Sequence, residues 1–207
     1  GEHEGRIYFA FEFLTGQSLR AEMDGRPINA RRALDLAIQM ADGVADAHAC
    51  GYVHGGLSPE SVVITAKGHA KIPACAFASR EGFASAGDAR LHDYDSPEEA
   101  RGLPPDERSD IYSVGALLFE MLTGKRPLHR GSAAPSATNP RVPREVDDVV
   151  LKAVAPNPDS RYQSSAAFAA ELRGAGAALD ARGAFDEELG DEPHSSSIGR
   201  ILIMTIV

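Results

Sequence analysis

The feature that most constrains this fold is the segment Asp110–Thr123, DIYSVGALLFEMLT, which is apolar on nearly every helical face. No single side of such a helix can be turned to water, so other elements must surround it. Gly124 directly after the segment and Pro127 three residues later indicate where the helix ends. The sequence therefore predicts a core helix around which the rest of the chain is packed.

Upstream of this segment the chain predicts one strand and one long helix. Arg6–Leu14 is aromatic and apolar, which is typical of a buried strand, and Thr15-Gly16 is expected to end it. Asn29 is placed to cap a helix that runs to about Ala49, because apolar residues recur after it at helical spacing. Gly51 lies just after this helix, at a position where a residue in the left-handed conformation commonly ends a helix.

The remaining elements favour an α+β fold in which helices dominate. Val62–Thr65 and Ala70–Ile72 are short β-rich runs joined through Lys67-Gly68, a hairpin signal. Residues 129–143 are rich in Pro, Ser, Ala and Gly and predict a loop with little structure. Two further short helices are expected at Val146–Val154 and about Ser165–Leu172. Strands followed mostly by helices differ from the alternating βαβ pattern of a parallel sheet.

Charge and cysteine content exclude some classes of function. The 207 residues carry a net charge of −9, whereas a nucleic-acid-binding protein presents a clustered basic surface, so we expect no nucleic-acid partner. Two cysteines are too few for a disulfide framework, which favours the reduced environment of the cytoplasm.

The segment Tyr52–Ile64, YVHGGLSPESVVI, resembles the catalytic loop of the protein kinase family, where His-Arg-Asp-Leu-Lys-Pro-Glu-Asn precedes an apolar strand. Four further segments resemble the same family, in its bacterial Ser/Thr form, in the family's order: the hinge strand at Phe11–Leu19, the end of the activation loop at Ser96–Gly102, the buried helix at Arg108–Gly124 and the approach to the last helix at Asp159–Gln163. The resemblance implies a kinase-like C-terminal lobe with its hinge strand and little or no N-terminal lobe.

The resemblance also implies that the family's catalytic groups are missing. The catalytic Asp falls on Gly56, the loop Lys on Ser58, the metal-ligating Asn on Ser61 and the first residue of Asp-Phe-Gly on Ala74. Glycine and alanine offer no side-chain oxygen to Mg²⁺, which prefers carboxylates. Loss of the base alone would forfeit about 10²–10⁴ in rate. We therefore expect no catalytic residue, no metal site and no cofactor.

The residues to which the resemblance gives structural roles are retained. They are His54, Leu57, Pro59 and Glu60 around the loop, and Glu98, Asp110 and Arg161 around the core helix. In the family, Asp110 ties the loop to the core helix, and Glu98 forms a buried ion pair with Arg161. Removing one partner of such a pair costs about 3–5 kcal/mol, so the retention of both fits a chain that still folds.

These observations lead to one hypothesis and its alternatives. We expect a pseudokinase, a signalling or binding module with a protein partner and no phosphotransferase activity. An active or atypical Ser/Thr protein kinase that uses ATP and Mg²⁺ is the first alternative, and a structural spacer or truncated gene product is another. The sequence leaves two questions open. One is whether the hinge residues Glu12, Phe13 and Leu14 bind a nucleotide without metal, and the other is whether an N-terminal lobe lies upstream.

The chain is expected to divide into three parts. Residues 1–172 form the kinase-like lobe, with the hinge strand from about residue 6. Residues 173–200 are expected to be an acidic flexible linker, since the stretch 180–200 holds six acidic and two basic residues. Ile201–Val207 is apolar, but a membrane helix needs roughly 20 such residues. We interpret this stub as the start of a truncated membrane segment, with a terminal strand or an arbitrary chain end as alternatives. The protein then lies in the cytoplasm, or on the cytoplasmic face of a membrane through residues beyond Val207.

Overall fold

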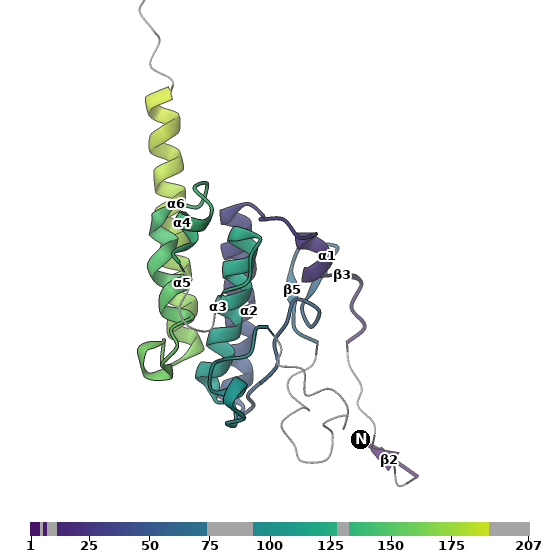
Figure 1. Ribbon diagram of the computed structural model, residues 1–207. Helices are drawn as coiled ribbons and strands as arrows, with labels where there is room; N and C mark the ends of the chain where they lie inside the picture. The colour runs from purple at the N-terminus through teal and green to yellow at the C-terminus, as the bar shows by residue number, and fades with distance from the viewer. Residues whose placement is uncertain (5, 8–11, 74–92, 128–132, 191–207) are drawn as a thin grey trace, which may run out of the picture.

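The computed structural model describes residues 1–4, 6–7, 12–73, 93–127 and 133–190 and, except for Ile7, the side chains of these residues as far as Arg182. Helices form one side of the molecule and two small sheets form the other (Figure 1). The mostly helical α+β class predicted from the sequence is confirmed.

Helix α3 (Glu107–Thr123) is the centre of the core. Every residue from Ser109 to Thr123 is buried, so the prediction of a core helix is confirmed. The helix begins at Glu107, three residues before the predicted start, because Asp106 caps it. The Asp106 side chain accepts a hydrogen bond from the Arg108 backbone N–H, and Ser109 completes a capping box. Gly124 ends the helix with a φ of 70°.

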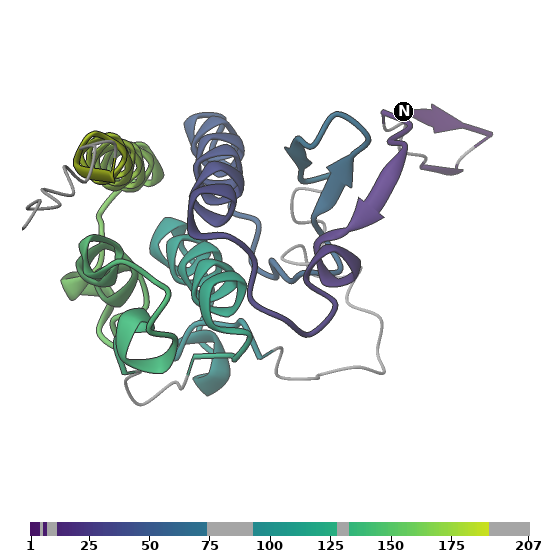
Figure 2. The same cartoon turned by 90° about the horizontal axis from the view of Figure 1, so that it is seen from above.

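Helix α2 (Ala30–Ala49) contacts both α3 and α6 (Ser165–Gly190), and Figure 2 shows the three helices side by side. The predicted N-cap is confirmed, since the Asn29 side chain accepts from two backbone N–H groups of the first turn. Gly51, just after the helix, has a φ of 77°, as its predicted cap position requires. Small and apolar residues such as Leu34, Ala37 and Ala41 face the core and allow close helix packing.

A three-stranded antiparallel sheet lies beside the helices in the order β3 (Gly16–Ser18), β4 (Val63–Thr65) and β5 (Ala70–Lys71). The predicted hairpin between the last two strands is confirmed. Helix α1 (Leu19–Met23) follows β3 directly, and its first residue, Leu19, donates its backbone N–H to the carbonyl of Val62. This hydrogen bond holds Val62, the residue just before β4, against the start of α1.

The predicted buried strand at Arg6–Leu14 is only partly confirmed, because Arg6–Ile7 is a strand but residues 12–14 are not. Residues 8–11 lie outside that part; Arg6–Ile7 (β2) pairs with Glu2–His3 (β1), and the side chain of Phe13 is 90% exposed. The strand that joins the main sheet starts at Gly16, which was expected to end a strand. A Cβ on Gly16 would lie 2.2 Å from the carbonyl oxygen of Ile64, so glycine is present for close backbone approach.

Downstream of α3 the chain is more helical than predicted. The expected loop over residues 129–143 contains the short helix α4 (Pro135–Thr138), while residues 128–132 lie outside the described part. The helix predicted at Val146–Val154 is confirmed as α5 (Asp147–Ala153). Single turns of 3₁₀ helix lie at Glu99–Arg101 (η1), Arg144–Val146 (η2) and Pro158–Ser160 (η3).

The prediction of a flexible linker from residue 173 is wrong as far as residue 190, because α6 continues through these residues. The segment is rich in alanine, the best helix former, and it packs against α2. Ala175 is buried, and Arg173 reaches Asp42 of α2 at 2.6 Å. The small residues that suggested a linker instead allow two helices to approach closely. Residues 191–207, with the predicted membrane stub, lie outside the described part.

Among the helices of the described residues, none combines the length and the apolar character that crossing a lipid bilayer requires.

Candidate functional site

The loop from His54 to Ser61 connects the end of α2 to β4, and Asp110 of α3 holds its first residues. The fully buried Asp110 carboxylate accepts the backbone N–H of His54 at 2.7 Å and that of Gly55 at 2.8 Å. His48 Nε2 lies 2.8 Å from the same carboxylate. A buried carboxylate needs such partners, so the core helix and the loop stabilise each other.

Gly55 and Gly56 both have backbone conformations that side chains disfavour. Gly55 has a φ of 56° and Gly56 a φ of 149°. A Cβ on Gly55 would lie 2.8 Å from Cγ of Pro105, whereas a Cβ on Gly56 would meet no atom within 4 Å. The position that the resemblance gives to the catalytic Asp is therefore open in space but carries no side chain, and its backbone favours glycine.

Ser58 and Ser61 bind each other across a tight turn. The Ser58 backbone N–H donates to Ser61 Oγ at 2.9 Å, and that hydroxyl donates to the Ser58 carbonyl at 2.9 Å. Leu57 is fully buried beneath the turn, and Pro59 accepts the backbone N–H of Arg20 at 3.1 Å. The Ser61 hydroxyl, at the position of the metal-ligating Asn, thus closes the loop on itself.

Glu60 belongs to a charged network that joins the loop to the core helix. Arg20 donates to Glu60 at 2.9 Å, to Glu120 at 2.8 Å and to the hydroxyl of Tyr94 at 2.6 Å, and Tyr94 in turn donates to Glu120. Burial alone would raise the pKa of Glu60, but its hydrogen bond with Arg20 lowers it. Burial and the neighbouring Glu120 raise the pKa of Tyr94.

Sequence reasoning missed Arg20, Tyr94 and Glu120 in this network. A signal was present in the sequence, because Glu120 is an acidic residue near the end of an otherwise apolar core helix. A buried carboxylate needs a cation or several donors. No local pattern, however, indicates which of the arginines supplies it, since Arg20 lies 100 residues away along the chain.

Glu98 and Arg161 form a buried pair beside the first turn of α3, where the resemblance implied one. The guanidinium donates to both carboxylate oxygens, at 2.6 and 2.8 Å, and Arg161 is only 2% exposed. Arg161 also donates to backbone carbonyls at 2.8 Å and 3.0 Å, and Ser109 donates to Glu98. Burial would raise the pKa of Glu98, but the hydrogen bonds from Arg161 lower it to about 2.

We call Glu98, Asp110 and Arg161 the framework. The hinge residues make none of its contacts. Glu12 accepts a hydrogen bond from Lys71 of β5 at 2.9 Å, Leu14 is half-buried, and Phe13 projects into solvent. Ala74, at the position of the metal-binding Asp, lies outside the described residues. In the described part of the chain no three His, Cys, Asp or Glu side chains are grouped to hold a metal ion.

This chain is similar to known proteins over most of its length. A family model described as the protein kinase domain matches residues 2–171. Serine/threonine-protein kinase PknB of Mycolicibacterium smegmatis is 32% identical over 188 residues, which cover 80% of this chain and 30% of that protein. Serine/threonine-protein kinase PrkC of Bacillus subtilis is 31% identical over 192 residues, or 84% of this chain and 30% of that protein. The chain thus spans less than a third of the length of either relative.

A solved structure supports the same fold. The kinase domain of PknI from Mycobacterium tuberculosis, crystallised as a double mutant, superposes with a TM-score of 0.65 at 24% sequence identity. The superposition covers 85% of this chain and 68% of that domain.

Proposed function

This chain belongs to the protein kinase domain family, and we propose that it is a pseudokinase, a signalling or binding module that acts without transferring phosphate. The family membership is that of bacterial Ser/Thr protein kinases. The proposed module recognises a protein partner and requires neither ATP nor Mg²⁺.

The observation that carries the proposal is the state of Gly56. Phosphoryl transfer needs a carboxylate that orients the attacking hydroxyl, and the family supplies it from this position. Here the residue has no side chain, and its φ of 149° lies where other residues are strained. Regaining the carboxylate would therefore require a change in backbone conformation as well as a substitution.

The neighbouring positions support the same proposal. The hydroxyl of Ser61 donates to the Ser58 carbonyl and accepts the Ser58 N–H, so its proton and one of its two lone pairs are bound within the turn. Ser58, at the position of the loop Lys, has no positive charge for the transferred phosphoryl group. The framework of Asp110, Glu98 and Arg161 remains engaged, which fits a lobe kept for its surfaces.

Phosphate transfer from labelled ATP to a generic protein substrate tests the proposal directly. The purified chain is incubated with ATP and Mg²⁺, with PknB of Mycolicibacterium smegmatis as the active control and EDTA as the blank. We expect incorporation equal to the EDTA blank. Sustained Mg²⁺-dependent incorporation above that blank would overturn the pseudokinase proposal.

A second candidate, an active Ser/Thr kinase with an unorthodox metal site, is favoured by the names of the relatives alone. Thermal denaturation separates the two candidates, because a ligand that binds only the native state raises its stability. Saturation at 100 times the dissociation constant would add about 2.7 kcal/mol. The pseudokinase proposal expects no shift in Tm that depends on ATP and Mg²⁺ together, and the second candidate expects one.

A further inference from the structure

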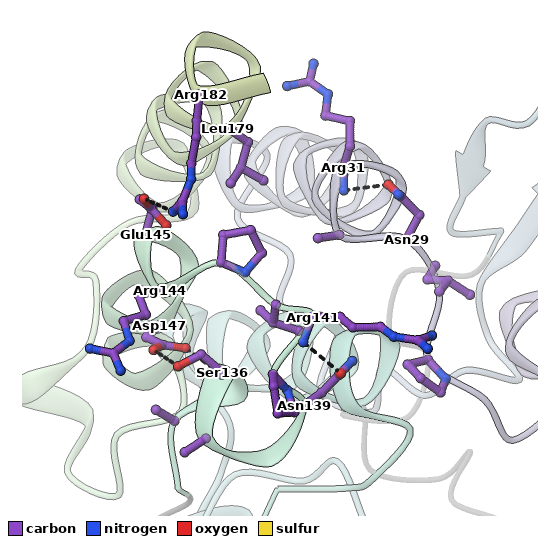
Figure 3. Close-up of a pocket in the computed structure, with 18 residues that line it drawn as sticks. Asn29, Arg31, Ser136, Asn139, Arg141, Arg144, Glu145, Asp147, Leu179 and Arg182 are labelled. Atoms are coloured by element: carbon purple, nitrogen blue, oxygen red, sulfur yellow. Dashed lines mark hydrogen bonds and ion pairs between the residues drawn. The ribbon is translucent and has the colours of Figure 1, made fainter. Parts of the chain in front are cut away.

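An open groove of about 1220 Å³ lies at the N-terminal end of α2 (Figure 3). Its walls are the first turn of α2, the segment from α4 to α5, and α6, which contributes Leu179 and Arg182. The loop from His54 to Ser61 follows the other end of α2. This helix has 20 residues and is about 30 Å long. The groove is therefore separate from the site described above.

One wall of the groove is a turn that internal hydrogen bonds hold in place. The side chain of Asn139 donates to the Leu122 carbonyl at the end of α3, at 2.7 Å, and accepts the backbone N–H of Arg141. The Val142 N–H donates to the Asn139 carbonyl at 2.9 Å, and the Val142 side chain is buried. This turn presents the side chain of Arg141 to solvent on a wall that is already ordered.

The charge of the groove is opposite to that of the protein. Its lining contains four arginines and two carboxylates, on a chain with a net charge of −9. Both carboxylates are already bound, because Glu145 accepts from Arg182 at 2.9 Å and Asp147 accepts from the backbone and hydroxyl of Ser136.

Two of the four arginines have no acidic partner among the described residues. Arg31 is paired with Asp180 at 2.8 Å, and Arg182 with Glu145. Arg141 and Arg144, three residues apart on the fixed turn and the start of η2, are exposed and make no ion pair within the described part of the chain. They provide two guanidinium groups of the kind that bind carboxylates in a bidentate manner.

The size of the groove indicates the kind of ligand. Small-molecule sites measure about 300–1,000 Å³ and enclose most of their ligand, whereas this groove is larger and open along its length. The lining also contains apolar side chains, among them Ile28 and Leu179. An open groove lined by both charged and apolar side chains suits an extended polypeptide.

We propose that this groove binds an extended, acidic peptide segment of a partner protein, whose carboxylates pair with Arg141 and Arg144. Apolar side chains of the segment pack over Ile28 and Leu179. This inference rests on the proposed binding role and names the surface and the class of partner, and it holds whether or not the loop transfers phosphate.

Selection from a display library of random twelve-residue peptides tests the inference without a known partner. The bait is the full chain, compared with the double variant Arg141→Glu/Arg144→Glu and with a control that has the same change in charge outside the groove, Lys67→Glu/Arg101→Glu. We expect the wild type and the control to enrich peptides rich in Asp and Glu. The groove variant should lose at least tenfold in affinity for those peptides, measured by fluorescence polarisation.

Three outcomes would overturn the inference: enrichment without an excess of acidic residues, equal binding by the groove variant, or an equal loss in the control variant. Because all four positions are exposed, circular dichroism and Tm should match the wild type. The phosphate-transfer assay does not depend on the groove. A result against the pseudokinase proposal is therefore distinguishable from a result against peptide binding in the groove.

A further variant distinguishes a partner from the chain itself, since Asp186, Glu187, Glu188, Asp191 and Glu192 are also acidic. These residues are replaced together by Asn and Gln. Unchanged peptide affinity supports a separate partner. A tenfold gain in affinity would mean that the chain's own acidic segment occupies the groove, and the partner proposal would then be wrong.

Discussion

Two regions that meet at helix α3 retain different parts of the kinase pattern. In the framework, Glu98, Asp110 and Arg161 are buried, and their charged groups bind one another or backbone groups. In the loop, Gly56 carries no side chain and the Ser61 hydroxyl bonds within its own turn. The buried charged groups of the framework are thus all partnered, whereas residue 56 carries no carboxylate, although Asp110 binds the backbone N–H of Gly55, the residue next to it.

The difference has a physical basis. A buried charge whose partner is removed destabilises the native state by several kcal/mol, so a folded chain keeps both partners. A catalytic carboxylate near the surface contributes little to stability, and its loss leaves the fold intact. Substitutions in the framework should therefore cost much stability, and substitutions in the loop should cost little unless they meet the unusual backbone.

Replacing Arg161 with Met should have the largest effect. The variant leaves the Glu98 carboxylate buried without its cation and removes hydrogen bonds to the carbonyls of Ala155 and Arg108. We expect the free energy of unfolding to fall by about 3–5 kcal/mol, measured by urea denaturation.

The matched control is Arg173→Met, which breaks the exposed pair with Asp42. Exposed pairs contribute about 0–1 kcal/mol, so this variant should stay close to the wild type. If both variants lose the same small amount of unfolding free energy, the buried pair does not stabilise the lobe more than an exposed pair does. The contrast between framework and loop would then be wrong.

Acid should weaken the same pair without any substitution. Since the folded-state pKa of Glu98 is about 2, below its ordinary value of 4.5, its contribution to stability is present above pH 4.5 and is lost as the pH falls toward 2. The shift corresponds to about 3 kcal/mol. Unfolding free energies of the wild type and Glu98→Gln, measured between pH 6 and pH 2.5, should converge as the pH falls. A difference that stays constant over this range would show that another group dominates acid unfolding.

Substituting Asp110 with Asn should cost less, about 2 kcal/mol, because the amide keeps one acceptor oxygen. The other carboxylate oxygen is replaced by an NH₂ group, which then faces the N–H of either His54 or Gly55. Hydrogen exchange at these two amides should accelerate along with the loss of stability. Asp42→Asn, on the surface of α2, is the control and should change neither measurement. Unchanged protection at His54 and Gly55 would contradict the role of Asp110 in holding the loop.

The sequence predicted what depends on strong local patterns or on the family motifs. The core helix followed from its apolar residues on every face, the cap at Asn29 from its residue type, and the Glu98–Arg161 pair from the resemblance. Arg20 and Glu120 could not be paired in advance, because their contact spans 100 residues. The length of α6 was missed because alanine and glycine suit a linker as well as a tightly packed helix, and only contact with α2 decides between them.

The conformation of Gly56 was also beyond the sequence, and it gives the smallest and most specific prediction. Gly56→Ala adds one methyl group to a position with no atom within 4 Å of its Cβ, so a purely steric view expects no cost. The φ of 149° instead predicts a loss of about 1–2 kcal/mol from backbone strain. Gly174→Ala, at an exposed position of helix α6, also has no neighbour within 4 Å and should stabilise the protein by about 0.5–1 kcal/mol. Thermal denaturation measures both changes in stability. A loss for Gly56→Ala together with a gain for Gly174→Ala would show that the loop backbone disfavours a side chain at residue 56. A gain in both variants would mean that the loop tolerates side chains freely and that a carboxylate could be introduced at residue 56 by substitution alone.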